Sequence, residues 1–137
     1  VVLAGPVESD AATGVDIAVI RLDQGGETLW TRTFGAAGDD WVRSVLETGD
    51  RRLALAGYTM SGDGGLYDMW VLLLAADGSL IREATFGGAA NEWARAIVEL
   101  PDGGLALAGD TWSWGAGGSD VWVVRLAPDF AGERAGR

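Results

Sequence analysis

The sequence predicts an all-β protein built from a repeated unit of antiparallel strands, and three observations lead to this prediction. First, residues of the same type recur along the chain at one fixed spacing of 52 positions. Second, the runs between turns are short and apolar, and none keeps the 3.6-residue period of a helix. Third, 22 glycines with only 3 prolines, in a chain that is 48% apolar, indicate many turns in a folded protein.

The repeat passes through apolar and turn positions alike, without a gap, as far as Ala127. The positions that match in three copies are Gly5/Gly57/Gly109, Asp16/Asp68/Asp120, Val19/Val71/Val123 and Leu22/Leu74/Leu126. The positions that match in two copies are Phe34/Phe86, Trp41/Trp93, Arg43/Arg95 and Glu47/Glu99. A period of about 50 residues with several strands in each copy is typical of a β-propeller blade.

One copy of the unit is complete, over residues 40–91, and it holds four strand-like runs. The first run, Asp40–Thr48, has a period of two. We therefore expect two sets of side chains on opposite faces of this strand: Trp41, Arg43, Val45 and Glu47 against Val42, Ser44 and Leu46.

The other three runs of the unit are expected to differ in their surroundings. The small residues of Arg52–Tyr58 suit a close approach of neighbouring sheets. Asp68–Leu74 is apolar on both faces, which predicts that both faces are covered. Leu80–Phe86 carries Arg82 and Glu83, and because charges commonly protect a free edge we expect this run at the outer edge of its sheet.

The predicted fold is a partial β-propeller with about two and a half four-stranded antiparallel blades. Strands are expected near residues 1–6, 16–23, 27–35, 40–48, 51–59, 68–75, 80–87, 92–100, 104–111 and 120–127. The expected units are a partial blade without its inner strand (1–39), a complete blade (40–91), a partial blade without its outer strand (92–127) and a flexible tail (128–137).

The count of blades falls short of the 4–8 that close a ring. The chain also begins in the middle of a strand and without Met. We therefore expect an excerpt of a longer propeller, or a chain that assembles with others. In isolation it should self-associate, because an open blade face exceeds the apolar area that soluble monomers usually expose.

Three groups of residues carry a resemblance to a known family. They are Asp102-Gly103-Gly104 with Ala108-Gly109-Asp110-Thr111, then Asp120 with Trp122-Val123-Val124 and Leu126, and then Gly26 with Trp30 and Thr33-Phe34-Gly35. Through them the chain resembles the kelch-like propeller repeats and, more closely, the related repeats of bacterial and archaeal surface proteins. The resemblance implies four-stranded blades round a central axis and an extracytoplasmic or cell-surface location. It implies little about activity, because such propellers serve as enzymes, lectins and interaction platforms.

Composition excludes several kinds of site. Without Cys or His there is no thiol nucleophile, no disulfide and no imidazole base, and without Lys there is no phosphate-binding loop of the G-x-x-x-x-G-K-[ST] type. The net charge of -10 makes binding to a nucleic-acid backbone a poor expectation. No apolar run approaches the ~20 residues of a membrane span. We expect neither a cofactor nor a metal.

The repeated aspartates Asp16, Asp68 and Asp120 allow two interpretations. They could form a ring of carboxylates that holds a cation. Alternatively, they accept backbone N–H bonds before the third strand or pair with Arg43 and Arg95, and we favour this structural interpretation. Trp41 and Trp93, and Trp70 and Trp122, are interpreted in the same way as packing residues between blades.

Candidate binding residues lie in the longer, Gly-rich loops, which the strand order places on one side of the molecule: 6–15, 35–39, 59–67, 88–91 and 111–119. Trp112 and Trp114 lie in the last of these loops, where two indoles could stack on a sugar or anchor a protein partner. The alternative is that one or both fold back over the sheet.

Asp39, Asp40 and Glu92 belong to the same side of the molecule. Two carboxylates about 5–10 Å apart could hydrolyse a glycoside, but the simpler interpretation is a set of solvated loop acids. No G-x-S-x-G or other nucleophile motif is present. The sequence therefore favours a non-enzymatic binding or scaffolding module, with a protein or glycan at the long loops and neighbouring blades as partners. The alternative is a fragment of a carbohydrate-binding or carbohydrate-active propeller.

Overall fold

The computed structural model describes residues 1–8, 14–60 and 66–130, and this part of the chain contains ten strands and no helix. All ten expected strands are confirmed, each within two residues of its expected bounds. The strands are β1 (Val2–Glu8), β2 (Val15–Leu22), β3 (Thr28–Phe34), β4 (Asp40–Glu47), β5 (Leu53–Thr59), β6 (Asp68–Leu74), β7 (Leu80–Phe86), β8 (Glu92–Glu99), β9 (Leu105–Thr111) and β10 (Asp120–Leu126).

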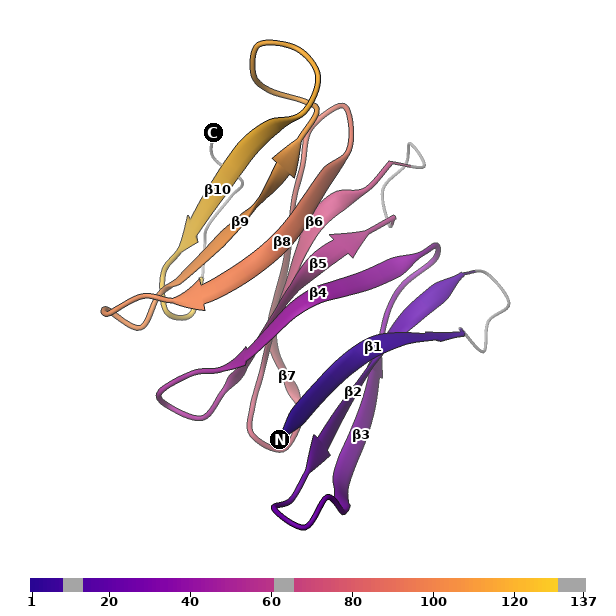
Figure 1. Cartoon of the computed structure of the whole chain (residues 1–137), viewed down its shortest axis with the longest axis vertical. Coiled ribbons are helices and arrows are strands. Elements are labelled where there is room, and N and C mark those ends of the chain that lie inside the picture. Colours follow the sequence, from indigo (N-terminus) through magenta and orange to yellow (C-terminus); the bar gives the residue numbers. More distant parts are fainter. Residues whose placement is uncertain (9–13, 61–65, 131–137) are drawn as a thin grey trace.

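The strands form three antiparallel sheets that follow one another along the chain (Figure 1). The first sheet has the order β1-β2-β3, the second β4-β5-β6-β7 and the third β8-β9-β10. Each sheet is a simple meander, because every connection joins neighbouring strands. The all-β antiparallel class expected from the sequence is therefore confirmed, and the three sheets remain open and do not close on one another.

The second sheet shows why its strands have their compositions. β6 is buried at every residue after Asp68, as expected for a strand that is apolar on both faces. β7 lies at one edge of the sheet, and its charged residues Arg82 and Glu83 are exposed, so the expected edge position is confirmed. The opposite edge strand, β4, contacts the neighbouring sheets through β1, β2 and β8.

The expected alternation of faces along β4 is wrong, because the strand contains a bulge. The pairing of β4 with β5 shifts between Val42 and Ser44, and the pairing of β8 with β9 shifts between Ala94 and Ala96. A bulge adds one residue to one strand, so the side chains beyond it change faces relative to a regular strand. The extra residues, Arg43 and Arg95, are 52 positions apart.

Glycine permits both bulges. A Cβ on Gly57 would overlap the carbonyl oxygen of Trp41, and a Cβ on Gly109 would overlap that of Trp93. The bulged backbone therefore approaches the neighbouring strand at a point where any side chain would collide with it. In the first sheet β1 is an edge strand, and a Cβ on Gly5 meets nothing within 4 Å.

Two apolar cores join the three sheets. The first and second sheets meet through a cluster around Ile17, Val19, Leu55 and Leu72, with Trp70 also buried in it. The second and third sheets meet through a larger cluster whose buried members are Ala54, Ala56, Met69, Val71, Leu73, Phe86, Ala94, Ile97, Leu105, Leu107, Trp122, Val124, Leu126 and Phe130. The packing role expected for Trp70 and Trp122 is confirmed. In the described part of the chain there is no helix long and apolar enough to cross a membrane.

Candidate functional site

The connections between strands separate onto two ends of the sheets (Figure 1). At one end lie the short turns around residues 23–27, 48–52, 75–79 and 100–104. At the other, which we call the long-loop end, lie the connections 35–39, 87–91 and 112–119. Two equivalent backbone bonds tie these loops together: Met60 N–H donates to Asp39 O and Trp112 N–H to Asn91 O, each at 3.0 Å.

Asp39 lies at the long-loop end and links the first sheet to the second. Its Oδ1 accepts a hydrogen bond from the backbone N–H of Val15 at 3.0 Å. The equivalent residue one repeat later is Asn91, whose Oδ1 accepts from Tyr67 N–H at the same distance. Because an uncharged amide performs the same task one repeat later, the contact at Asp39 needs an oxygen acceptor and not a charge.

Asp40 and Glu92 are buried, so the interpretation of these two acids as solvated loop residues is wrong. Asp40 is 2% exposed and Glu92 0%. An Oδ2 atom of Asp40 accepts the N–H of Ala36 at 2.8 Å, and Oε2 of Glu92 accepts the N–H of Gly88 at 2.7 Å. The two residues are 52 positions apart, and each fixes the loop four residues before it.

Glu92 is bound further by the loop that follows β9. Its Oε1 accepts the hydroxyl of Thr111 at 2.9 Å and the N–H of Ser113 at 3.1 Å. Burial of a carboxylate is tolerated where such donors replace water. Glu92 is therefore an internal acceptor that holds two long loops against the second and third sheets.

The repeated aspartates lie next to these buried acids. A Cβ on Gly87 would overlap Oδ1 of Asp68 and lie 3.0 Å from Oε2 of Glu92, so the two carboxyl groups share one small space. Burial, and then the charge of Glu92, raises the pKa of Asp68 above its ordinary value. At Gly35, the equivalent position one repeat earlier, a Cβ would overlap Asp16 and lie 2.9 Å from Oδ2 of Asp40.

The third repeated aspartate has the structural role that we favoured. Oδ2 of Asp120 accepts the N–H of Ala116 at 3.1 Å, just before its strand. The expected pairing of these aspartates with the repeated arginines is wrong for the described residues: Arg95 pairs with Asp110 and Arg43 binds the hydroxyl of Tyr58. In the described part of the chain, no three acidic side chains are placed to hold a metal ion.

A small hollow lies beside Asp40, between the first and second sheets. Its volume is about 240 Å³, and its lining includes Thr59, Trp70 and Glu83. This is below the ~300–1,000 Å³ typical of sites for drug-sized ligands. The carboxyl of Asp40 is already engaged by Ala36 at its edge. Of the two carboxylates that line this hollow, Asp40 is buried and Glu83 is exposed.

Trp112 and Trp114 have different surroundings. Trp114 folds back over the sheet, as the second interpretation expected, whereas Trp112 remains partly exposed, as the first interpretation requires. The indole of Trp114 packs onto the core and against Trp122, with ring centroids 4.8 Å apart. Trp112 is 37% exposed and contacts Trp93 edge-on, at 4.6 Å between centroids. Only Trp112 thus presents a large part of its ring to solvent.

Trp112 is one end of a row of aromatic rings that the sequence interpretation missed. The row consists of Trp41, Tyr58, Tyr67, Trp93 and Trp112, and it runs across β4, β5 and β8 near the long-loop end. Its centroid separations are 6.5 Å for Trp41 and Tyr58, 5.1 Å for Tyr58 and Tyr67, and 5.9 Å for Tyr58 and Trp93. The 52-residue spacing of Trp41 and Trp93 indicated packing; only the register and the bulges show that the tyrosines join them.

Two arginines border the aromatic row. The guanidinium of Arg43 lies 5.8 Å from the ring centre of Trp41 and 5.4 Å from that of Tyr58, and Arg95 lies 5.1 Å from Trp93. Both are exposed residues, and both are the extra residues of the strand bulges. The bulges therefore direct the two cations over the rings, where the attraction between cation and π face holds them.

The polar atoms of the row are partly used inside it. The hydroxyl of Tyr58 accepts a bond from Arg43 at 2.7 Å. Burial, followed by electrostatic repulsion from Asp39 and Tyr58, raises the pKa of Tyr67 above its ordinary value. Nε1 of Trp93 is buried and has no hydrogen-bond partner in the described part of the chain.

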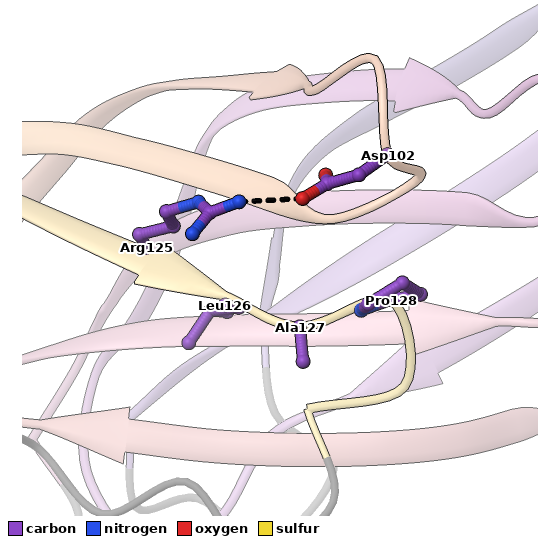
Figure 2. A pocket seen from close by; sticks show the side chains of 5 residues that line it. All are labelled: Asp102, Arg125, Leu126, Ala127 and Pro128. Carbon is purple, nitrogen blue, oxygen red and sulfur yellow. Dashed lines mark hydrogen bonds and ion pairs between the residues drawn. The ribbon is translucent and has the colours of Figure 1, made fainter.

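A second hollow lies at the opposite, short-turn end. It has a volume of about 360 Å³ and is lined by Asp102, Arg125, Leu126, Ala127 and Pro128. Figure 2 shows Arg125 and Asp102 pointing toward one another across its rim, where they form an ion pair. Both side chains of this ion pair are largely exposed, so the charges at the rim of the hollow are paired with each other.

No family model matches the chain, and no curated protein matches it.

Proposed function

We propose that this chain is a segment of a β-propeller, longer or oligomeric, that acts as a non-enzymatic binding or scaffolding module. The resemblance to surface-protein repeats extends the proposal to an extracytoplasmic or cell-surface setting. Three open sheets in succession, with equivalent bulges, loop ties and buried acids 52 residues apart, support the propeller arrangement.

The aromatic row carries the binding part of the proposal. Trp, Tyr and Arg are the residues enriched where alanine substitution weakens protein interfaces most. Here they form a contiguous row on and beside β4, β5 and β8, which ends in the exposed ring of Trp112. A protein partner is favoured, because half-buried rings with bordering guanidinium groups offer apolar contact and hydrogen-bond donors together.

The buried acids support a function without catalysis. A general acid or base must reach the proton that it transfers. Glu92 is fully buried and its two oxygens accept three hydrogen bonds, while Asp40 is engaged by its own loop. Their equivalent roles in two successive repeats are those of loop supports.

The test uses peptides as the probe. The parent chain would be screened against a phage-displayed peptide library, and each bound peptide would then be titrated against Trp112→Ala and Arg43→Ala. Loss of a hot-spot residue should weaken binding by about tenfold or more. Leu29→Ala is the matched control, because Leu29 is 59% exposed on β3, outside the row.

Peptide ligands whose affinity falls in both row variants and not in Leu29→Ala are the expected result. Ligands that bind all variants equally would contradict the assignment of the row.

A glycan is the second candidate, and the exposed ring of Trp112 is the observation that favours it. Sugars stack on a single exposed indole, whereas the other rings of the row present less of their faces. A glycan array gives a direct answer: signals that disappear in Trp112→Ala and persist in Arg43→Ala would favour the carbohydrate-binding alternative over a protein partner.

A further inference from the structure

Two sheet faces at opposite ends of the molecule are exposed and mostly apolar. The first-sheet open face consists of Val1, Leu3, Ala18, Ile20 and Leu22, which are paired across β1 and β2. The third-sheet open face consists of Ala106, Ala108, Val121, Val123 and Arg125, which are paired across β9 and β10, and Asp110 lies beside Val121 at its edge. Its two charged residues form ion pairs, Asp110 with Arg95 and Arg125 with Asp102. Leu3 is 51% exposed, Val121 81% and Val123 61%.

The repeat shows what covers the third-sheet open face. The residues of the second sheet that lie one repeat earlier are Ala54, Ala56, Met69, Val71 and Leu73, and all are at most 1% exposed. They are buried against the third sheet, through Leu105, Leu107, Trp122, Val124 and Leu126. Inside the molecule, the second-sheet face that is equivalent to the third-sheet open face is thus covered by the leucine-rich face of the next sheet.

The first-sheet open face is of that leucine-rich type. One repeat later, its residues become Leu53, Leu55, Trp70, Leu72 and Leu74, which are buried against the first sheet. One further repeat along the chain, these five positions are Leu105, Leu107, Trp122, Val124 and Leu126, the third-sheet residues that cover Met69 and Val71. The two open faces are therefore the two halves of an interface that the molecule already forms twice.

We propose that a second copy of this chain docks its first-sheet open face onto the third-sheet open face of the first copy. This inference rests on the propeller part of the proposed function, through the packing of neighbouring sheets, and not on partner binding at the aromatic row. The contact is head-to-tail, so each added copy leaves one face of each type free, and association continues until a ring closes.

The interface between copies is smaller than its internal counterparts. Ala18 stands where the other copies have the large buried side chains of Trp70 and Trp122. A hollow of about 240 Å³ results, lined by Leu3, Ala4, Gly5, Pro6, Ala18 and Ile20. We therefore expect weak, concentration-dependent association.

The test uses one charged substitution on each face, Leu3→Arg and Val123→Arg. Both side chains are more than half exposed, so neither change should affect the fold; circular dichroism and the thermal midpoint check this. Sedimentation velocity from about 1 to 300 µM should show an average mass that rises for the parent and stays monomeric for each variant alone, since micromolar complexes dissociate in this range.

Mixing the two variants decides the geometry. The Leu3→Arg chain keeps an intact third-sheet face and the Val123→Arg chain an intact first-sheet face, so the mixture should form a 1:1 dimer and nothing larger. A parent that stays monomeric throughout would overturn the proposal. So would a mixture that stays monomeric, or self-association that only one of the two substitutions prevents. Peptide binding by the aromatic row is tested separately, at protein concentrations where the parent is monomeric, because Trp93 and Arg95 adjoin the third-sheet open face through Asp110.

Discussion

Gly57→Ala and Gly5→Ala place the same methyl group at equivalent positions of two repeats, with opposite expected results. On Gly57 the Cβ overlaps the carbonyl oxygen of Trp41, which belongs to the bulge of β4. The obstacle is backbone in a paired strand and cannot move aside as a flexible side chain would. On Gly5 the same Cβ meets open space.

The expected changes in the free energy of unfolding follow from this contrast. Overpacking typically costs about 1–3 kcal/mol, and a collision with backbone belongs at the upper end, so we expect Gly57→Ala to lose about 2–3 kcal/mol. Gly5→Ala removes a flexible residue from a strand without a collision and should gain about 0.5 kcal/mol. The expected difference between the two variants is thus about 3 kcal/mol, roughly 1–2 M in the urea midpoint for a protein of this size.

The assay is urea unfolding of both variants at the same low protein concentration, followed by tryptophan fluorescence and circular dichroism. Equal slopes with separated midpoints would assign the effect to stability. Free energies of unfolding that agree within about 0.5 kcal/mol would refute the argument, because the close approach of β4 to β5 at Gly57 would then not exist.

Two further predictions concern the acids. Glu92→Gln should lower the free energy of unfolding by about 1–3 kcal/mol, because the new amide N–H₂ group would face the N–H and O–H donors that now bind the carboxylate. Asp39→Asn should change the free energy of unfolding little, since Asn91 already accepts the equivalent hydrogen bond one repeat later. Equal losses for the two variants in urea titrations would contradict this difference. Asp68→Asn should stabilise the protein near pH 7: the pKa of Asp68 is raised, so its ionisation opposes folding above that pKa and not below the ordinary 3.8. Its advantage over the parent in urea midpoints should shrink toward pH 4, and an Asn variant that is less stable at both pH values would be inconsistent with this reasoning.

Strand positions and burial could be predicted because they depend on local patterns. The apolar run Asp68–Leu74 has no polar face to offer to solvent, and it is buried on both sides. The charges of Arg82 and Glu83 could be accommodated only where no neighbouring strand covers them, and they lie on an edge strand. In both cases the side chains within a single run determine whether its strand is buried or lies at an edge.

The candidate site could be predicted only in part, because it depends on register between runs. One extra residue in β4 changes the face on which every later side chain of the strand lies. The bulge that contains this residue fits only because Gly57, in the neighbouring strand β5, has no side chain. The aromatic row joins Tyr58 to Trp93 across two sheets. Likewise, Asp40 and Glu92 resemble loop acids until the N–H groups of their own loops fold onto them.

The three sheets follow one another along the chain as successive units of one 52-residue repeat. The chain lacks Cys, so nitroxide labels can be attached to cysteines introduced at Gln24, Ala76 and Pro128, exposed residues 52 positions apart. Pulsed electron–electron distance measurements on the three doubly labelled chains, diluted with unlabelled protein, then report how the sheets are spaced. Equal distances are expected for 24–76 and 76–128, and a longer distance for 24–128. Unequal neighbouring distances, or a 24–128 distance as short as the other two, would show that the sheets are not successive units of one repeat.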